Sequence, residues 1–269
     1  MGKKIYLTIL YIITIFCIGF GIFYHFYGNF TNWNTGNEKQ VKIDKRELSA
    51  FENLDLDLDT ADITLKQEGT TYTISYAFQN KTEPTISNKD GLLKIKQKTK
   101  KLGFFKNMKH KKKAQITITV PTNATFSSLV LSNDVGSVKI DSIQAQTMKL
   151  TGSVGNLDIK NCSGKDFTCE NDVGDSKINN CSFTNMKVIG DTGNIKLESC
   201  VFSTLNGSND VGDIKATKCE NLTDYKIDLT TDLGSIRVGK KKQGTSYHST
   251  GSTQKSIILK TDLGNIKLE

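Results

Sequence analysis

The sequence predicts an all-β protein, a parallel β-solenoid with about 19 residues per coil, preceded by an N-terminal β cap and a single N-terminal transmembrane helix. The solenoid prediction begins with a repeated phrase, SNDVGSVKI at 132–140, ENDVGDSKI at 170–178 and SNDVGDIKA at 208–216. Between these copies lie Gly155 and Gly193, which reduce the step between glycines to 19 residues. The chain has only two prolines but much glycine, threonine and asparagine, which favours strands and turns over helices.

Apolar residues recur at fixed distances from the repeat glycine. One residue before it stand Val135, Val154, Val173, Thr192, Val211, Leu233 and Leu263. Two and four residues after it stand pairs such as Val138 and Ile140, Leu157 and Ile159, and Ile195 and Leu197. This alternation predicts a strand with one buried face. A second strand is indicated by Met148, Phe167, Met186 and Leu205. Coils of two strands and two turns, stacked about 4.8 Å apart, would pair each strand in parallel with its equivalent.

The N-terminal region predicts a membrane anchor. No Asp, Glu, Lys or Arg occurs between Lys4 and Glu38, and the 23 residues at 5–27 are almost continuously apolar. As a helix they would span about 35 Å, enough for a hydrocarbon core of about 30 Å. Lys3 and Lys4 place residues 1–4 in the cytoplasm, so residues 28–48 form a tether and the body is extracytoplasmic. A cleaved signal peptide, with a small-residue site at 19–21, is the alternative.

Residues 49–125 are predicted to form the N-terminal β cap, and residues 126–269 the solenoid repeats. The stretch LDLDLDTADITLKQ at 54–67 reads as a degenerate coil with Ala61 at the glycine position. Three alternating runs, TYTISYAF, GLLKIKQK and AQITITVP, predict the other strands of the cap. Near the C-terminus, the polar insertion GKKKQGTSYHSTGSTQ predicts the end of regular stacking.

A lysine-rich loop at 94–113 is the first candidate binding site. It contains ten lysines and no acidic residue, and removing those lysines would take the net charge from +8 to −2. Apolar residues at its middle, surrounded by lysines, would suit insertion into an anionic membrane. The alternative is an exposed hairpin whose lysines keep it soluble; nucleic acid is not expected outside the cell. The membrane- or polyanion-binding candidates are Lys94, Lys96, Lys98, Lys100, Lys101, Leu102, Phe104, Phe105, Lys106, Lys109, Lys111, Lys112 and Lys113.

A basic stripe along the solenoid is the second candidate site. Three residues after the repeat glycines stand cations that should point outward, with Asp158 as the exception. They are Lys139, Lys177, Lys196, Lys215, Arg237 and Lys267. Such a stripe would suit a polyanion with regularly repeated charge, such as a teichoic acid. The alternative is a solvated face partly neutralised by Asp175, Asp213 and Glu198.

Repeated cysteines and aspartates raise the question of metals. Cys162, Cys181, Cys200 and Cys219 follow the 19-residue period, but a column about 14 Å long cannot place four sulfurs about 2.3 Å from one zinc ion. Inter-coil disulfides and a small apolar core ladder remain open for these cysteines. An aspartate column two residues before the glycines could hold calcium or cap turns. No metal or cofactor is predicted.

The anchor, the recurring Asp-x-Gly-(Asp/Asn/Ser)-(Ile/Val/Leu) phrase and the stretch QITITVPTNATFSSLVLSNDVG together resemble a known family. It comprises membrane-anchored bacterial β-solenoid domains classed as candidate adhesins, of unknown molecular function, including the Lia-type member of cell-envelope-stress operons. The resemblance covers the chain from Ser49 onward and implies architecture and envelope location rather than catalysis.

The expected function is therefore a binding or scaffold module, single-pass in the cell membrane, that could be linked to envelope stress. Expected partners are the membrane through the anchor, an anionic wall polymer or lipid surface, and an envelope protein. The alternative is a polysaccharide-active solenoid enzyme using Asp175, Asp213, Lys177 and Lys215 on one outer strand. With three histidines in the chain and no evident Ser/His/Asp or Cys/His arrangement, no enzyme is predicted.

Overall fold

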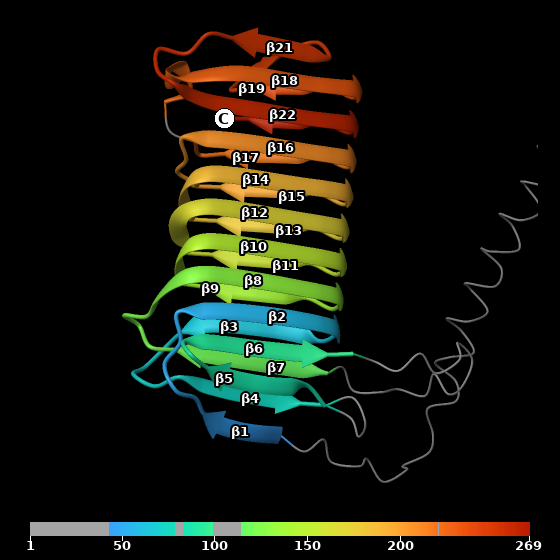
Figure 1. Cartoon of the computed structure of the whole chain (residues 1–269). Coiled ribbons are helices and arrows are strands. Elements are labelled where there is room, and N and C mark those ends of the chain that lie inside the picture. Colours follow the sequence, from blue (N-terminus) through green and yellow to red (C-terminus); the bar gives the residue numbers. More distant parts are fainter. Residues whose placement is uncertain (1–42, 79–82, 99–113, 220) are drawn as a thin grey trace, which may run out of the picture. The chain divides into compact units, whose positions relative to one another are not determined.

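A computed structural model describes residues 43–269 except 79–82, 99–113 and 220 (Figure 1). These residues belong to one compact unit, Val41–Glu269. They are almost all strand and turn, with one short 3-10 helix at Leu222–Asp224. None of the helices in this part of the chain is long and apolar enough to cross a membrane. The predicted cytoplasmic residues 1–4, the anchor at 5–27 and most of the tether lie outside the described residues.

Two sheets face each other, and each regular coil gives one long strand to an 11-stranded sheet and one short strand to a 12-stranded sheet. The long strands are β8 (Thr125–Val135), β10 (Gln144–Val154), β12 (Ser163–Val173), β14 (Ser182–Thr192) and β16 (Thr204–Val211). The short strands are β9 (Val138–Asp141), β11 (Leu157–Lys160), β13 (Ser176–Asn179), β15 (Ile195–Glu198) and β17 (Ile214–Thr217). Neighbours pair in parallel with equivalent residues in register, as Met148 with Phe167, which confirms the parallel solenoid (Figure 1).

At the N-terminal end, the coils do not stack in chain order. The coil of β2 (Asn53–Thr60) and β3 (Asp62–Gln67) lies against β8 and β9, with Ala61 at the corner as predicted. Outside it lies the coil of β6 (Leu92–Gln97) and β7 (Gln115–Val120). Three antiparallel strands complete this end: β1 (Ile43–Glu47), β4 (Thr73–Ala77) and β5 (Thr85–Lys89). The three alternating runs are therefore strands, and two of them form a further parallel coil.

The C-terminal end is also reordered. The last coil in sequence, β22 (Lys255–Leu263) and β23 (Ile266–Leu268), lies between β16/β17 and the coil of β18 (Tyr225–Leu233) and β19 (Ile236–Val238). Two antiparallel strands, β20 (Lys241–Lys242) and β21 (Ser246–Ser249), end the sheets. Antiparallel strands thus cover the parallel stack at both ends, which limits the exposure of a long regular edge.

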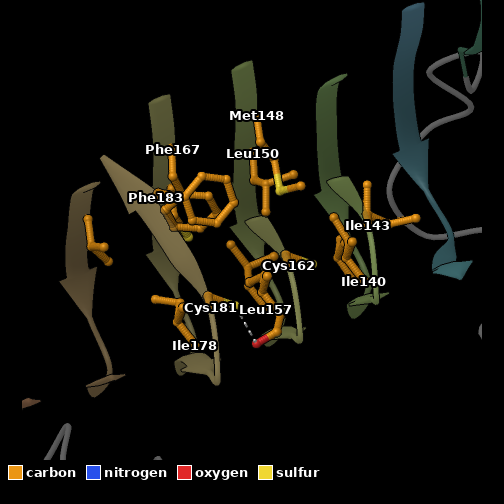
Figure 2. Packing of buried hydrophobic residues seen from close by; sticks show 14 of the residues in the cluster. Ile140, Ile143, Met148, Leu150, Leu157, Cys162, Phe167, Ile178, Cys181 and Phe183 are labelled. Carbon is orange, nitrogen blue, oxygen red and sulfur yellow. Dashed lines mark hydrogen bonds between the residues drawn. The ribbon is translucent and has the colours of Figure 1, made fainter. Parts of the chain in front are cut away.

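The core lies between the sheets, where apolar side chains of successive coils stack (Figure 2). The predicted pairs two and four residues after each glycine are buried, except that Val238 is half-buried; Met148, Phe167, Met186 and Leu205 are buried as well. The residues one position before the glycine were predicted to belong to the buried face, and this prediction is wrong. Val135 is 46% exposed and Val154 is 49% exposed. The chain turns at the glycine, so the inward alternation restarts on its far side.

In the coils from Gly136 to Gly212, glycine is required at the corner between the long and short strands. From Gly136 to Gly212, these glycines have φ angles of 137° to 149°, which side-chain-bearing residues rarely adopt. A Cβ on Gly174 would lie 2.0 Å from the carbonyl oxygen of Gly155 in the preceding coil. The residues that follow the repeat glycines form a ladder of hydrogen bonds between successive coils, the corner ladder. Asp175 Oδ1 accepts a hydrogen bond from the Asn194 backbone N–H at 2.9 Å, and Asn194 Oδ1 accepts one from the Asp213 N–H at 3.1 Å.

An alternation of asparagine and glycine explains why the phrase recurs every 38 residues. Asn171 and Asn209 are buried three residues before the corner glycine, while Gly152 and Gly190 occupy the same place in alternate coils. Asn171 Nδ2 donates to the Gly155 oxygen at 3.1 Å. A Cβ on Gly152 would lie only 2.7 Å from Asn171 Oδ1. Asn171 and Asn209 therefore each face a glycine of the preceding coil, so the repeat in this part of the solenoid is two coils, whereas Asn133 at its start faces Leu58.

Candidate functional site

The predicted basic stripe forms a continuous row on the outer face of the 12-stranded sheet. Register places its cations on neighbouring strands in the order Lys177, Lys196, Lys215, Lys267, Arg237 and Lys242. The insertion of β23 puts Lys267 between Lys215 and Arg237, so the row is unbroken. Asp158 separates this basic row from Lys139. Sequence reasoning missed Lys242, because β20 is two residues long and carries no repeat signal.

Nearby carboxylates neutralise part of the basic row. Lys196 pairs with Glu198 at 2.9 Å, Lys215 with Asp213 at 3.0 Å, and Lys267 with Glu269 at 2.8 Å. Ion pairs between described residues leave Lys177 and Arg237 without a carboxylate partner. Exposed pairs of this kind contribute little to stability, so the paired lysines can exchange partners at low cost.

Glu198 should contribute a small pH dependence to folding, limited by solvent screening of its exposed ion pairs. Hydrogen bonds from Lys218 and Lys196 lower the pKa of this carboxyl from its usual 4.5 to about 2. Because the folded pKa is the lower one, the stabilisation is present above pH 4.5 and is lost as the pH falls towards 2. Glu198→Gln should therefore flatten the decline of unfolding free energy between pH 5 and pH 2, measured by urea titration. Identical declines in both proteins would contradict this assignment.

The lysines of the predicted loop divide into two groups. Lys94 and Lys96 belong to β6, and Lys98 follows it; all three pair with aspartates of the adjacent β2. Lys94 lies 2.9 Å from Asp55, and Lys98 lies 2.9 Å from Asp57. These three lysines are therefore partly neutralised by the body. The other candidates lie outside the described residues: Lys100, Lys101, Leu102, Phe104, Phe105, Lys106, Lys109, Lys111, Lys112 and Lys113.

Asp175 and Asp213, the carboxylates of the enzyme alternative, have structural contacts. Asp213 Oδ1 accepts hydrogen bonds from the Asn265 backbone N–H at 3.0 Å and side-chain Nδ2 at 3.1 Å. Partial burial opposes ionisation, but the Asn265 N–H and Lys215 outweigh it and hold the pKa of Asp213 below its usual value. A general acid at neutral pH needs the opposite shift. These carboxylates thus serve the corner ladder.

The cysteine column is a ladder of free thiols. Cys162, Cys181 and Cys200 are buried and Cys219 is half-buried (Figure 2 shows the first two). The Cys162 thiol donates to the Lys160 carbonyl oxygen at 3.1 Å. Burial raises the pKa of Cys200 and of Cys219 to about 11, which disfavours the reactive thiolate. Of the two alternatives, the structure shows the small apolar ladder. In the described part of the chain, no group of three or more His, Cys, Asp or Glu is arranged to hold a metal ion.

Comparison with known proteins identifies a family. The model of the family described as Toastrack DUF4097 matches residues 51–253. A solved candidate adhesin from Bacteroides fragilis is 19% identical, with a TM-score of 0.48, over 86% of this chain and 98% of that one. A candidate cell adhesion protein from Clostridium sporogenes is 14% identical, with a TM-score of 0.41, over 85% and 99%. No curated protein matches the sequence significantly. Because the family model matches well over half of this chain, the chain belongs to the Toastrack DUF4097 family.

Proposed function

We propose that the protein is a membrane-anchored, extracytoplasmic binding and scaffold module of the bacterial envelope, and that its basic row binds an anionic wall polymer. The observation that carries this proposal is the unbroken register of six cations, from Lys177 to Lys242. Strands about 4.8 Å apart present these charges over roughly 24 Å of a rigid face. A polymer with a phosphate in every unit, such as a teichoic acid, could contact several of them at once.

The location is a separate part of the proposal and rests on the apolar stretch at 5–27 and the lysines before it. Full-length protein expressed in a Gram-positive bacterium should sediment with membranes. In intact protoplasts, added protease should digest its body. A soluble cytosolic distribution would contradict both the anchor and the envelope function, including a link to envelope stress.

The binding test uses residues 28–269, which include the whole compact unit, and purified wall teichoic acid. Substituting Lys177, Lys196 and Lys215 with Gln should weaken binding roughly tenfold at low salt, as expected for three contacts of about 0.5 kcal/mol each. The matched control substitutes Lys149, Lys187 and Lys226 with Gln on the other sheet, where these side chains are also exposed. Equal losses in both variants would show that only net charge matters and would contradict the assigned face.

Residues 99–113 are proposed as a second anionic contact, directed at lipid. Their seven lysines surround Leu102, Phe104, Phe105 and Met108. Replacing this stretch with a short neutral turn should abolish binding to vesicles of phosphatidylglycerol while leaving teichoic acid binding intact. Unchanged vesicle binding would exclude this contact.

A further inference from the structure

Two exposed columns run side by side along the corner that precedes the repeat glycines. One is acidic and the other is apolar, and together they are named the acidic-apolar ridge. The acidic column comprises Asp134, Asp172, Asp191, Asp210, Asp262 and Asp232, with Ser153 as its interruption. The apolar column comprises Val135, Val154, Val173, Val211, Leu263 and Leu233, with Thr192 as its interruption.

Most of the ridge's negative charge and its apolar surface have no partner among the described residues. Its apolar residues are 44% to 70% exposed although they stand in register on successive strands. An exposed apolar strip of this kind, here interrupted at Thr192, commonly marks an interaction surface. The aspartates repel one another at about one strand spacing. Lys260 forms an ion pair with Asp262 at 3.1 Å and also interacts electrostatically with Asp232 and Asp210, whereas ion pairs between described residues leave Asp134, Asp172 and Asp191 without a cation. A ligand for this surface must be both basic and apolar.

The chain itself contains a segment of that chemistry at 99–113, with seven lysines, no acidic residue and two adjacent phenylalanines. The described residues on either side show where this segment begins and ends. Leu58 pairs with Gln97 at the end of β6, and Asp62 pairs with Gln115 at the start of β7. Gln97 and Gln115, described residues close to the segment's two ends, therefore flank the corner position beside Thr60, in line with the ridge.

The length of the segment also fits the ridge. Both of its ends lie on one coil, so its 15 residues can extend about seven residues away, or roughly 23 Å at 3.3 Å per residue. That reach equals nearly five strand spacings. Counting from the coil of β6 and β7, the residues in line are Thr60, Val135, Val154, Val173 and Thr192. Phe104 and Phe105, near the middle of the segment, can reach Val154 and Val173.

We propose that the acidic-apolar ridge is a docking site for residues 99–113 of the same chain. The lysines lie against Asp134, Asp172 and Asp191, and the phenylalanines cover Val154 and Val173. This goes beyond the proposed function, because the ridge and the basic row are different surfaces. Docking would hold the lysine-rich segment on the body and reduce its availability to anionic lipid.

Limited trypsin digestion of residues 28–269 tests the proposal, because trypsin cleaves after the segment's lysines. The ridge variant carries Asp134→Ser, Asp172→Ser, Asp191→Ser, Val154→Thr and Val173→Thr. Ser153 and Thr192 already occupy these columns, so the coils accommodate both residues. Cleavage within 99–113, followed by mass spectrometry, should be at least about fivefold faster in the variant, because cleavage follows the undocked fraction.

The matched control makes the same kinds of change elsewhere: Glu52→Ser, Glu170→Ser, Asp228→Ser, Val130→Thr and Ile258→Thr. It should be cleaved at the parent rate, and thermal melting should show that all three proteins are folded. Equal rates in the parent and the ridge variant would overturn the proposal. So would protection that disappears on hundredfold dilution, because the occupant would then be a second copy. Failure of teichoic acid binding would leave this result unaffected, so the two proposals fail independently.

Discussion

Replacing Gly174 with alanine should destabilise the body by about 3 kcal/mol or more. The φ angle of 137° imposes backbone strain on alanine. The new Cβ would also stand 2.0 Å from the Gly155 carbonyl oxygen. That oxygen cannot easily move, because it accepts the hydrogen bond from Asn171 and belongs to the corner of the preceding coil. The substitution therefore forces two coils apart.

The unfolding free energy of residues 28–269 in urea measures this effect. Gly244→Ala is the matched control, because a Cβ at Gly244 would meet no atom within 4 Å. It should change stability by less than about 0.5 kcal/mol. A loss below about 1 kcal/mol for Gly174→Ala would contradict the close approach of successive corners.

The sequence predicted the repeating part of the fold because one set of residues carries both its period and its geometry. The glycine, the corner ladder and the buried pair after it recur together, and even the degenerate coil, where Ala61 replaces the glycine, kept the ladder at Asp62 and the buried Ile63 and Leu65. The order of coils at the C-terminus was not predictable in the same way. The phrases TDLGSIR at 231–237 and TDLGNIK at 261–267 are nearly equivalent, so local pattern alone does not decide which coil packs against β17.

Sequence analysis found the candidate sites that follow the coil period and missed contacts that depend on how the coils are arranged in space. The basic row follows the coil period, so most of its members could be found from sequence. The pairing of Lys94 with Asp55 was missed, because it depends on β2 and β6 being parallel neighbours outside the repeat. The exposed valines were mistaken for core because spacing from the glycine does not show where the chain turns. The acidic-apolar ridge became visible only after that correction.

Gly190→Ala should destabilise the body by about 2 kcal/mol for a different reason, the two-coil repeat. Its Cβ would lie 2.5 Å from Asn209 Oδ1, a buried oxygen with no hydrogen-bond partner in the described part of the chain. Asn209 is held in place because its Nδ2 donates to the Gly193 carbonyl oxygen at 2.9 Å. The amide therefore cannot rotate away from the new methyl group without losing that bond.

Threonine at position 209 should relieve the conflict. Thr261 and Thr231 occupy the equivalent place in adjacent coils and donate through Oγ1 to the Gly212 and Gly264 carbonyl oxygens at 3.0 and 2.8 Å. Threonine thus keeps the hydrogen bond without needing a glycine neighbour. Gly190→Ala with Asn209→Thr should recover at least about 1 kcal/mol of unfolding free energy relative to additive single effects. Asn171→Thr is the matched control, because Asn171 faces Gly152. This substitution should restore the stability of Gly152→Ala but not that of Gly190→Ala. If either threonine substitution restored the stability of both alanine variants, the effect would come from a general loosening of the core rather than from a paired Asn–Gly contact.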